Sequence, residues 1–150
     1  MAGRNGRTVF TYELYIAASS KAVWRAIVDP DMTERYFSGM RFDGVVKKGA
    51  PYALRAGDEV ATDGRIVEVV PAKRLRMTWR GRWNAAVEED APSRVTYEIE
   101  AAGKVTRLRL VHDRFDGETA TYRATSAGWP AVLSSLKTLL ESGKPLALKL

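Results

Sequence analysis

The stretch that decides the fold is SAGWPAVLSSLKTLLESGKP, Ser126 to Pro145, close to the C-terminus. From Val132 onward it predicts an amphipathic helix, because apolar residues recur with helical spacing on one side. The same spacing points Ser134, Ser135 and Lys137 toward solvent. The predicted buried stripe consists of Trp129, Val132, Leu133, Leu136, Leu139 and Leu140.

The helix is preceded by Gly128-Trp129-Pro130, three residues that start or bend helices rather than continue them. Proline lacks the N–H of a helix interior and disfavours helical geometry at the preceding residue. Pro130 is therefore expected either in the first turn of the helix or at a kink after a helical segment that starts near Thr119. The segment before it contains few other helix breakers, which favours the kink. We expect Gly128 to let the backbone pass close to a sheet, and Trp129 to close one end of a cavity.

The middle of the chain is a series of short apolar stretches separated by turn residues, which is typical of an antiparallel meander. We expect strands at residues 41–47, 52–56, 65–70, 74–80, 94–101 and 105–115, with a loop over residues 82–93. The alternation in residues 65–70 is ambiguous, whereas Gly103 predicts a tight hairpin between the last two strands. Those two strands have clear inner faces, formed by Val95, Tyr97, Ile99 and Ala101 and by Leu108, Leu110 and His112.

The N-terminal part adds one strand and two helices. Residues 7–16 alternate with period two, as a strand does. Ser19 or Ser20 can cap a following helix that Asp29-Pro30 ends, and a second short helix follows as far as Gly39. This order of elements predicts an α+β fold, in which a curved antiparallel sheet of about six to seven strands holds the long C-terminal helix.

Length and composition limit the class of protein. The 150 residues fit one domain, which we expect over residues 7–150 after a flexible tail at residues 1–6. No run approaches the ~20 apolar residues that cross a bilayer, and no signal peptide is recognisable. With no cysteine, disulfides and thiol catalysis are excluded, and a cytoplasmic location is favoured. With a single histidine, a zinc site is not expected.

The net charge of +6 raises the question of a nucleic-acid partner. The basic residues are interleaved with acidic ones, apart from a denser patch at residues 73–83. On a strand, Arg74, Arg76 and Arg80 would share the outer face, where arginine is usually solvated. We therefore expect neither a nucleic-acid partner nor insertion into a membrane.

Four segments carry a resemblance to a known family: ASSKAVWRAIVDPDMTERYF, GRIVEVVPAKRLRMTW, PSRVTYEIE and GWPAVLSSLKTLLESG. In this order they resemble the START-like (SRPBCC) superfamily with its helix-grip fold, from about residue 7 to residue 143. Within it, the chain is similar to the branch of the C-terminal domain of the activator of Hsp90 ATPase. The resemblance implies a cavity for apolar small molecules between the sheet and the long helix.

The chain departs from this family pattern at Tyr36-Phe37, where a tryptophan is expected before the phenylalanine. We expect the departure to leave a hydroxyl near one mouth of the cavity. The eukaryotic activator also carries an N-terminal chaperone-binding domain, for which these 150 residues hold no second segment. The activity in the family name is therefore not expected to transfer.

The candidate ligand-binding residues are those expected to face this cavity, although core packing alone can also explain them. Glu68 is expected to face outward, because an unpaired buried carboxylate is costly. His112 and Tyr97 are the weak catalytic candidates, and His112 can equally be a buried histidine bonded to a neighbour. The ligand-binding candidates are Trp24, Tyr36, Phe37, Tyr52, Met77, Trp79, Tyr97, Leu110, His112, Trp129, Leu133 and Leu136.

Three classes of function remain. We favour non-catalytic binding of a hydrophobic small molecule, either lipid-like or aromatic, because no nucleophile elbow, phosphate loop or dinucleotide motif occurs. The alternative is a polyketide cyclase- or dehydratase-like enzyme in which His112 and Tyr97 do acid–base work. The third is a chaperone-associated or stress-response interaction module that uses the outer surface. No metal or cofactor is predicted, and a monomer or weak homodimer is expected.

Overall fold

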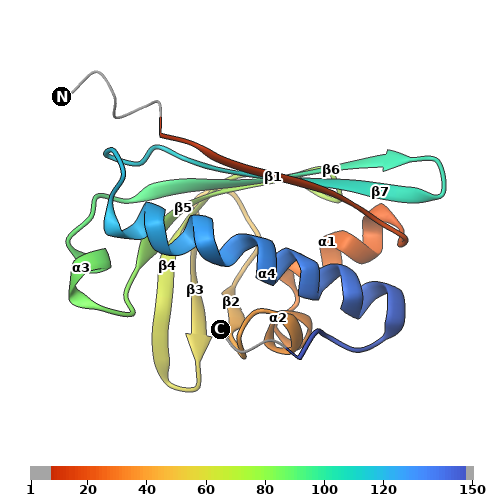
Figure 1. The fold of residues 1–150 in the computed structure, drawn as a ribbon, viewed down its shortest axis with the longest axis horizontal. Coiled ribbons are helices and arrows are strands. Elements are labelled where there is room, and N and C mark those ends of the chain that lie inside the picture. The colour runs from red at the N-terminus through yellow and green to blue at the C-terminus, as the bar shows by residue number, and fades with distance from the viewer. Residues whose placement is uncertain (1–7, 148–150) are drawn as a thin grey trace.

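A seven-stranded antiparallel sheet curves around one long C-terminal helix in the computed structural model, which describes residues 8–147 (Figure 1). The expected tail at residues 1–6 lies outside the described residues. The strands are β1 (Phe10–Ile16), β2 (Arg41–Gly44), β3 (Pro51–Ala56), β4 (Glu59–Val70), β5 (Arg74–Gly81), β6 (Ser93–Ala102) and β7 (Val105–Asp113). The helices are α1 (Ser20–Val28), α2 (Pro30–Tyr36), α3 (Ala85–Glu88) and α4 (Ala120–Ser142).

The strands follow the order β1-β7-β6-β5-β4-β3-β2 across the sheet, so the first strand pairs with the last. Helix α4 crosses the inner face of the sheet, with α3 beside its N-terminal half and α1 and α2 toward its C-terminal half (Figure 1). The predicted α+β helix-grip architecture is confirmed.

Helix α4 buries the predicted stripe. Trp129, Val132, Leu133, Leu136 and Leu139 are buried, and Leu140 packs against the same core. The helix runs unbroken from Ala120 past Pro130, with Thr119 as its N-cap, so the predicted helical segment before the proline is confirmed.

One assignment on α4 was wrong. Ser135 does not face solvent but is 5% exposed, because the chain after the helix folds back over it. The backbone N–H of Leu146 donates to Ser135 Oγ at 3.2 Å, and Arg35 donates to the carbonyl of Gly143 at 2.9 Å. These two bonds hold the C-terminal segment against α4 and α2.

The ambiguous strand is β4, which is also longer than predicted and begins at Glu59. Its pairing with β5 shifts between Ile66 and Glu68, which leaves Val67 as an extra residue and explains the broken alternation. Glu68 then faces outward, as expected, and lies 3.3 Å from Arg74 and 3.8 Å from Arg76.

The first half of β4 contains Asp63 and Gly64, residues that usually indicate a turn. They form a strand here because β3 and β5 pair with it from both sides. A Cβ atom on Gly64 would lie 2.2 Å from the carbonyl oxygen of Thr78. Glycine is therefore required where the two strands approach this closely.

The loop predicted over residues 82–93 contains the short helix α3, which the sequence pattern did not indicate. Asn84 caps it by accepting a hydrogen bond from the backbone of Val87 at 3.0 Å, and Val87 is buried. The hairpin at Gly103 is confirmed, with φ of 69° at the glycine. Strands β2 and β7 end at Gly44 and Asp113, earlier than predicted.

Candidate ligand-binding groove

An apolar groove of about 560 Å³ opens at one end of the sheet, beside the N-terminal half of α4. The loop between α2 and β2 forms one wall, and the facing ends of β4 and β5 with the residues after β5 form the other. Its lining residues are Phe37, Ser38, Met40, Ala61, Thr62, Trp79, Trp83, Ala124, Thr125, Gly128, Trp129 and Val132.

Only three of the twelve predicted site residues, Phe37, Trp79 and Trp129, line this groove. Side chains of the hydrophobic core pack between the sheet and the helix, where the cavity was expected. Trp24 lies on α1 and is partly buried against the same core. The predicted residues that pack in the core instead are Tyr36, Tyr52, Met77, Tyr97, Leu110, His112, Leu133 and Leu136.

Nine lining residues are absent from the predicted site, because most lie in segments predicted as connections or off the predicted stripe of the C-terminal helix, where no periodicity marks an inner face. Trp83 carried the one usable signal, since a tryptophan in a predicted loop is unusual for a solvated segment. The missed residues are Ser38, Met40, Ala61, Thr62, Trp83, Ala124, Thr125, Gly128 and Val132.

Gly128 has a different role from the one expected. The backbone does not approach the sheet there, because within residues 8–147 no atom beyond its chain neighbours and its own helix backbone lies within 4 Å of the position of an added Cβ. A side chain at residue 128 would instead project into open space, and the residue lines the groove. The missing side chain therefore leaves part of the groove open.

His112 lies behind the groove and is completely buried. The indole N–H of Trp129 donates to its Nδ1 at 3.0 Å, so the proton of the neutral ring is on Nε2. Nε2 donates to Ser93 Oγ at 2.7 Å, and the hydroxyl of Ser93 donates to the carbonyl of Trp79 at 3.3 Å. Burial lowers the pKa of His112 to about 3, so the ring stays neutral near neutral pH.

The tyrosine hydroxyls lie in the core rather than in the groove. The hydroxyl of Tyr36 was expected at a cavity mouth, and this prediction was wrong. It donates instead to the carbonyl of Ala26 at 2.8 Å and so joins α2 to α1. Tyr52 donates to the carbonyl of Thr78 at 2.6 Å, which is the same carbonyl that leaves no room for a side chain at Gly64. Burial raises the pKa of Tyr36, Tyr52 and Tyr97, so none is a proton donor of ordinary strength.

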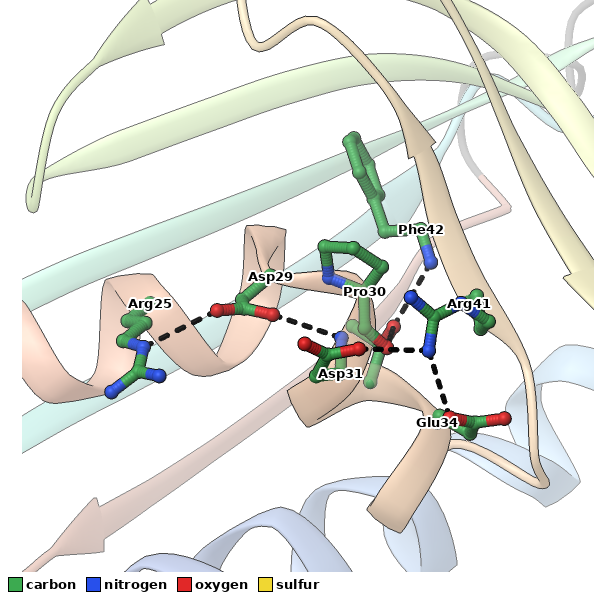
Figure 2. Close-up of polar contacts among 8 residues, drawn as sticks. Arg25, Asp29, Pro30, Asp31, Glu34, Arg41 and Phe42 are labelled. Atoms are coloured by element: carbon green, nitrogen blue, oxygen red, sulfur yellow. Dashed lines mark hydrogen bonds and ion pairs between the residues drawn. The ribbon is translucent and has the colours of Figure 1, made fainter.

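The loop wall of the groove is fixed at both ends. Figure 2 shows Arg41, on β2, reaching back to α2, where one nitrogen lies 2.9 Å from Asp31 and 2.8 Å from Glu34. These hydrogen bonds raise the pKa of Arg41. Within the loop Ser38 has φ of 50°, a left-handed conformation that is rare outside glycine and common at functional sites.

The start of α2 is also held by hydrogen bonds to a charged side chain. Asp29 caps the helix by accepting from the backbone of Asp31 at 2.8 Å, and it also accepts from Arg25 at 3.3 Å (Figure 2). Burial alone would raise the pKa of Asp29, but these hydrogen bonds outweigh it and the pKa is lowered. The backbone N–H of Phe42 donates to Thr33 Oγ1 at 3.0 Å, which ties β2 to α2.

No charged side chain of the described residues lines the groove. Its polar side chains are three hydroxyls and the indoles of Trp79, Trp83 and Trp129, of which Trp129 is already bonded to His112. The indole N–H of Trp79 is buried without a partner among the described residues, which costs about 1–3 kcal/mol. The groove therefore suits an uncharged, mainly apolar molecule.

A second hollow, of about 580 Å³, lies over β2, β3 and β4, and three of its four charged lining residues, Asp43, Arg55 and Asp63, are already in ion pairs. Arg55 lies 2.7 Å from Asp43, and Arg82, next to the hollow, lies 3.2 Å from Asp63. Residues 8–147 bring together no group of three His, Cys, Asp or Glu side chains that could hold a metal ion. Within the same residues, no helix has the length and apolar character needed to cross a membrane.

Residues 17–141 match the family model described as activator of Hsp90 ATPase homolog 1-like protein. The chain belongs to this family. The START-like resemblance is thereby confirmed, while a search of curated protein sequences gives no match.

Solved structures support the same fold. The chain is similar to protein MLL2253 from Mesorhizobium loti, with 26% identity, a TM-score of 0.76, and 89% of this chain and 96% of that chain covered. An HSP90 activator from Plasmodium falciparum has 20% identity and a TM-score of 0.73, with 89% and 96% covered. The Aha1 dimer from Colwellia psychrerythraea has 19% identity and a TM-score of 0.74, with 91% and 98% covered. The last two likenesses concern the fold alone.

Proposed function

We propose that this protein binds an uncharged, hydrophobic small molecule in the groove beside α4, without catalysing a reaction on it. The observation that carries the proposal is the groove itself, about 560 Å³ in volume and lined mainly by apolar and aromatic side chains. Small-molecule sites usually have this size and this composition, with a few polar groups for orientation. The unpaired indole N–H of Trp79, a lining residue, also supports a site whose packing is not completed by the protein.

The enzyme alternative has less support. An acid–base mechanism needs a proton-transferring group within hydrogen-bond reach of the substrate. His112 and Tyr97 do not line the groove, and both ring nitrogens of His112 are occupied inside the core. An interaction with a chaperone, suggested by the HSP90 activator from Plasmodium falciparum, would use the outer surface, and the sheet presents paired charges there.

The experiment is a fluorescence titration with N-phenyl-1-naphthylamine, an uncharged apolar probe, on the wild type and two variants. Gly128→Leu should fill the groove without a clash, because open space surrounds the added side chain. We expect it to weaken probe binding about tenfold or more, which is about 1.4 kcal/mol. Ala127→Leu is the matched control, since Ala127 is an exposed neighbour on α4 outside the groove lining.

The control variant should bind the probe as the wild type does. A wild type that does not bind the probe, or a Gly128→Leu variant that binds it with unchanged affinity, would contradict the proposal. Native mass spectrometry of the purified protein should in addition show a co-purifying molecule in the wild type and none in Gly128→Leu. Equal loading of both proteins would count against the groove as the site.

A further inference from the structure

Trp83 differs from the other aromatic residues of the groove. Phe37, Trp79 and Trp129 are buried, whereas Trp83 is 42% exposed and still lines the groove. An exposed tryptophan does not contribute to the core to the same extent, so its position needs another explanation. Its ring presents free aromatic surface at the mouth of the groove.

The ring of Trp83 lies directly against the backbone of Gly81, the last residue of β5. A Cβ atom on Gly81 would be 2.7 Å from Cζ3 and 2.9 Å from Cη2 of the Trp83 ring. It would also be 3.1 Å from Cγ2 of Val87, which is buried. A residue with any side chain at position 81 would therefore push the ring away, and glycine permits the observed position.

The segment that carries Trp83 is fixed on both sides. Arg80 donates to the carbonyl of Glu88 at 2.9 Å, across the loop and α3. Asp90 accepts from both the backbone N–H and the hydroxyl of Thr121, at 2.8 and 2.7 Å, which ties the loop to the start of α4. The indole is thus held in place before any ligand arrives, which lowers the entropic cost of binding.

An indole that is held close to the backbone at two of its ring atoms and is still 42% exposed offers aromatic surface for stacking. Aromatic stacking favours planar conjugated partners beyond the effect of the area that is buried. Among residues 8–147, no lysine, arginine or histidine lines the groove to pair with the carboxylate of a fatty acid. The surroundings of Trp83 therefore favour planar uncharged molecules over both lipid anions and flexible chains.

We propose that Trp83, positioned by Gly81, makes the groove selective for planar, uncharged, conjugated molecules over aliphatic ones. The inference rests on the proposed function, because it names the chemical class of ligand for the same groove. It assigns to Trp83 a specificity-determining role and to Gly81 a positioning role.

The test compares flavone, a planar uncharged ketone, with 1-decanol, an uncharged aliphatic alcohol, by isothermal titration calorimetry. The wild type should bind flavone more tightly. Trp83→Leu keeps an apolar side chain but removes the flat ring, and should weaken flavone binding about five- to tenfold while leaving 1-decanol within about twofold. Trp83→Phe should restore most of the preference for flavone.

Gly81→Ala is a second, independent variant, because it retains the indole and should only displace it. We expect it to lower flavone affinity in the same direction and to change the near-ultraviolet circular dichroism of the tryptophans. Equal losses for flavone and 1-decanol in Trp83→Leu, or no loss for either, would overturn the selectivity while the groove remained a binding site. Failure of the wild type to bind either compound would overturn the proposed function together with this inference.

Discussion

At the scale of single residues, His112 belongs to a residue type that often acts in catalysis, but its surroundings are those of a structural residue. Its two nitrogens connect α4, through Trp129, to β6, through Ser93. Each of the two buried ring nitrogens has a hydrogen-bond partner. These hydrogen bonds fix the position of Trp129 and thereby the inner wall of the groove. The histidine therefore helps to fix the shape of the groove through its hydrogen bonds.

His112 is the only histidine in the sequence, so its titration can be followed without ambiguity. Because burial lowers its pKa to about 3, its ring resonances should not shift between pH 8 and about pH 5. Nitrogen NMR shifts should show the proton on Nε2, as the bond from Trp129 to Nδ1 requires. A midpoint near pH 6.5 would contradict the buried neutral ring.

The same shift makes the stability of the protein depend on pH. Between the pKa of about 3 in the folded state and about 6.5 in the unfolded state, the unfolded chain binds the extra proton. The free energy of unfolding should therefore fall as the pH falls through this window, with a slope approaching about 1.4 kcal/mol per pH unit. Urea denaturation at several pH values measures the slope, and His112→Gln should remove this contribution from it.

At the scale of elements, two glycines in regular structure have opposite roles. Gly64 lies in β4 where the carbonyl of Thr78 leaves no room for a side chain, whereas Gly128 lies in α4 beside open space. Gly64→Ala should destabilise the fold by about 3 kcal/mol through overpacking. Gly128→Ala should stabilise it by about 1 kcal/mol, because alanine has the higher helix propensity.

Urea denaturation of the two alanine variants tests both expectations with the same chemical change. A Gly64→Ala variant as stable as the wild type would contradict the close approach of β4 to β5. A destabilised Gly128→Ala variant would show that the residue is packed after all. If Gly128→Ala is more stable yet binds the apolar probe less well, stability has been given up at this position for an open groove.

Periodicity explains which elements the sequence predicted. The stripe on α4 and the inner faces of β6 and β7 repeat with regular spacing, so they were found, apart from Ala101, which is exposed near the end of β6. The groove was misplaced because Met40 and Trp83 lie in connecting segments. The positions of these segments depend on contacts between residues that are apart in the sequence, such as Arg41 with Asp31 and Asp90 with Thr121. Gly128 was misinterpreted because a missing side chain indicates either close approach or open space, and sequence alone does not separate the two.

At the scale of the whole molecule, attraction of a nucleic acid depends more on where the charged side chains lie than on the net charge. The outer face of the sheet carries rows of arginine and acidic side chains on neighbouring strands. Arg94 forms two hydrogen bonds with Asp113, at 3.0 and 2.8 Å, and Arg107 lies 3.1 Å from Glu100. Neighbouring acids therefore offset much of the positive potential that a phosphate backbone would need.

We therefore expect no saturable binding to a short labelled DNA duplex at physiological ionic strength, despite the net charge of +6, as measured by fluorescence anisotropy. Glu98→Gln combined with Glu100→Gln is the informative variant, because it removes acidic partners of Arg109 and Arg107. This variant should gain weak binding that disappears as salt is added, since such binding depends on counterion release. Tight, strongly salt-dependent binding by the wild type would instead mean that its arginines act together as a basic surface, and the pairing across the sheet would not be what determines its partners.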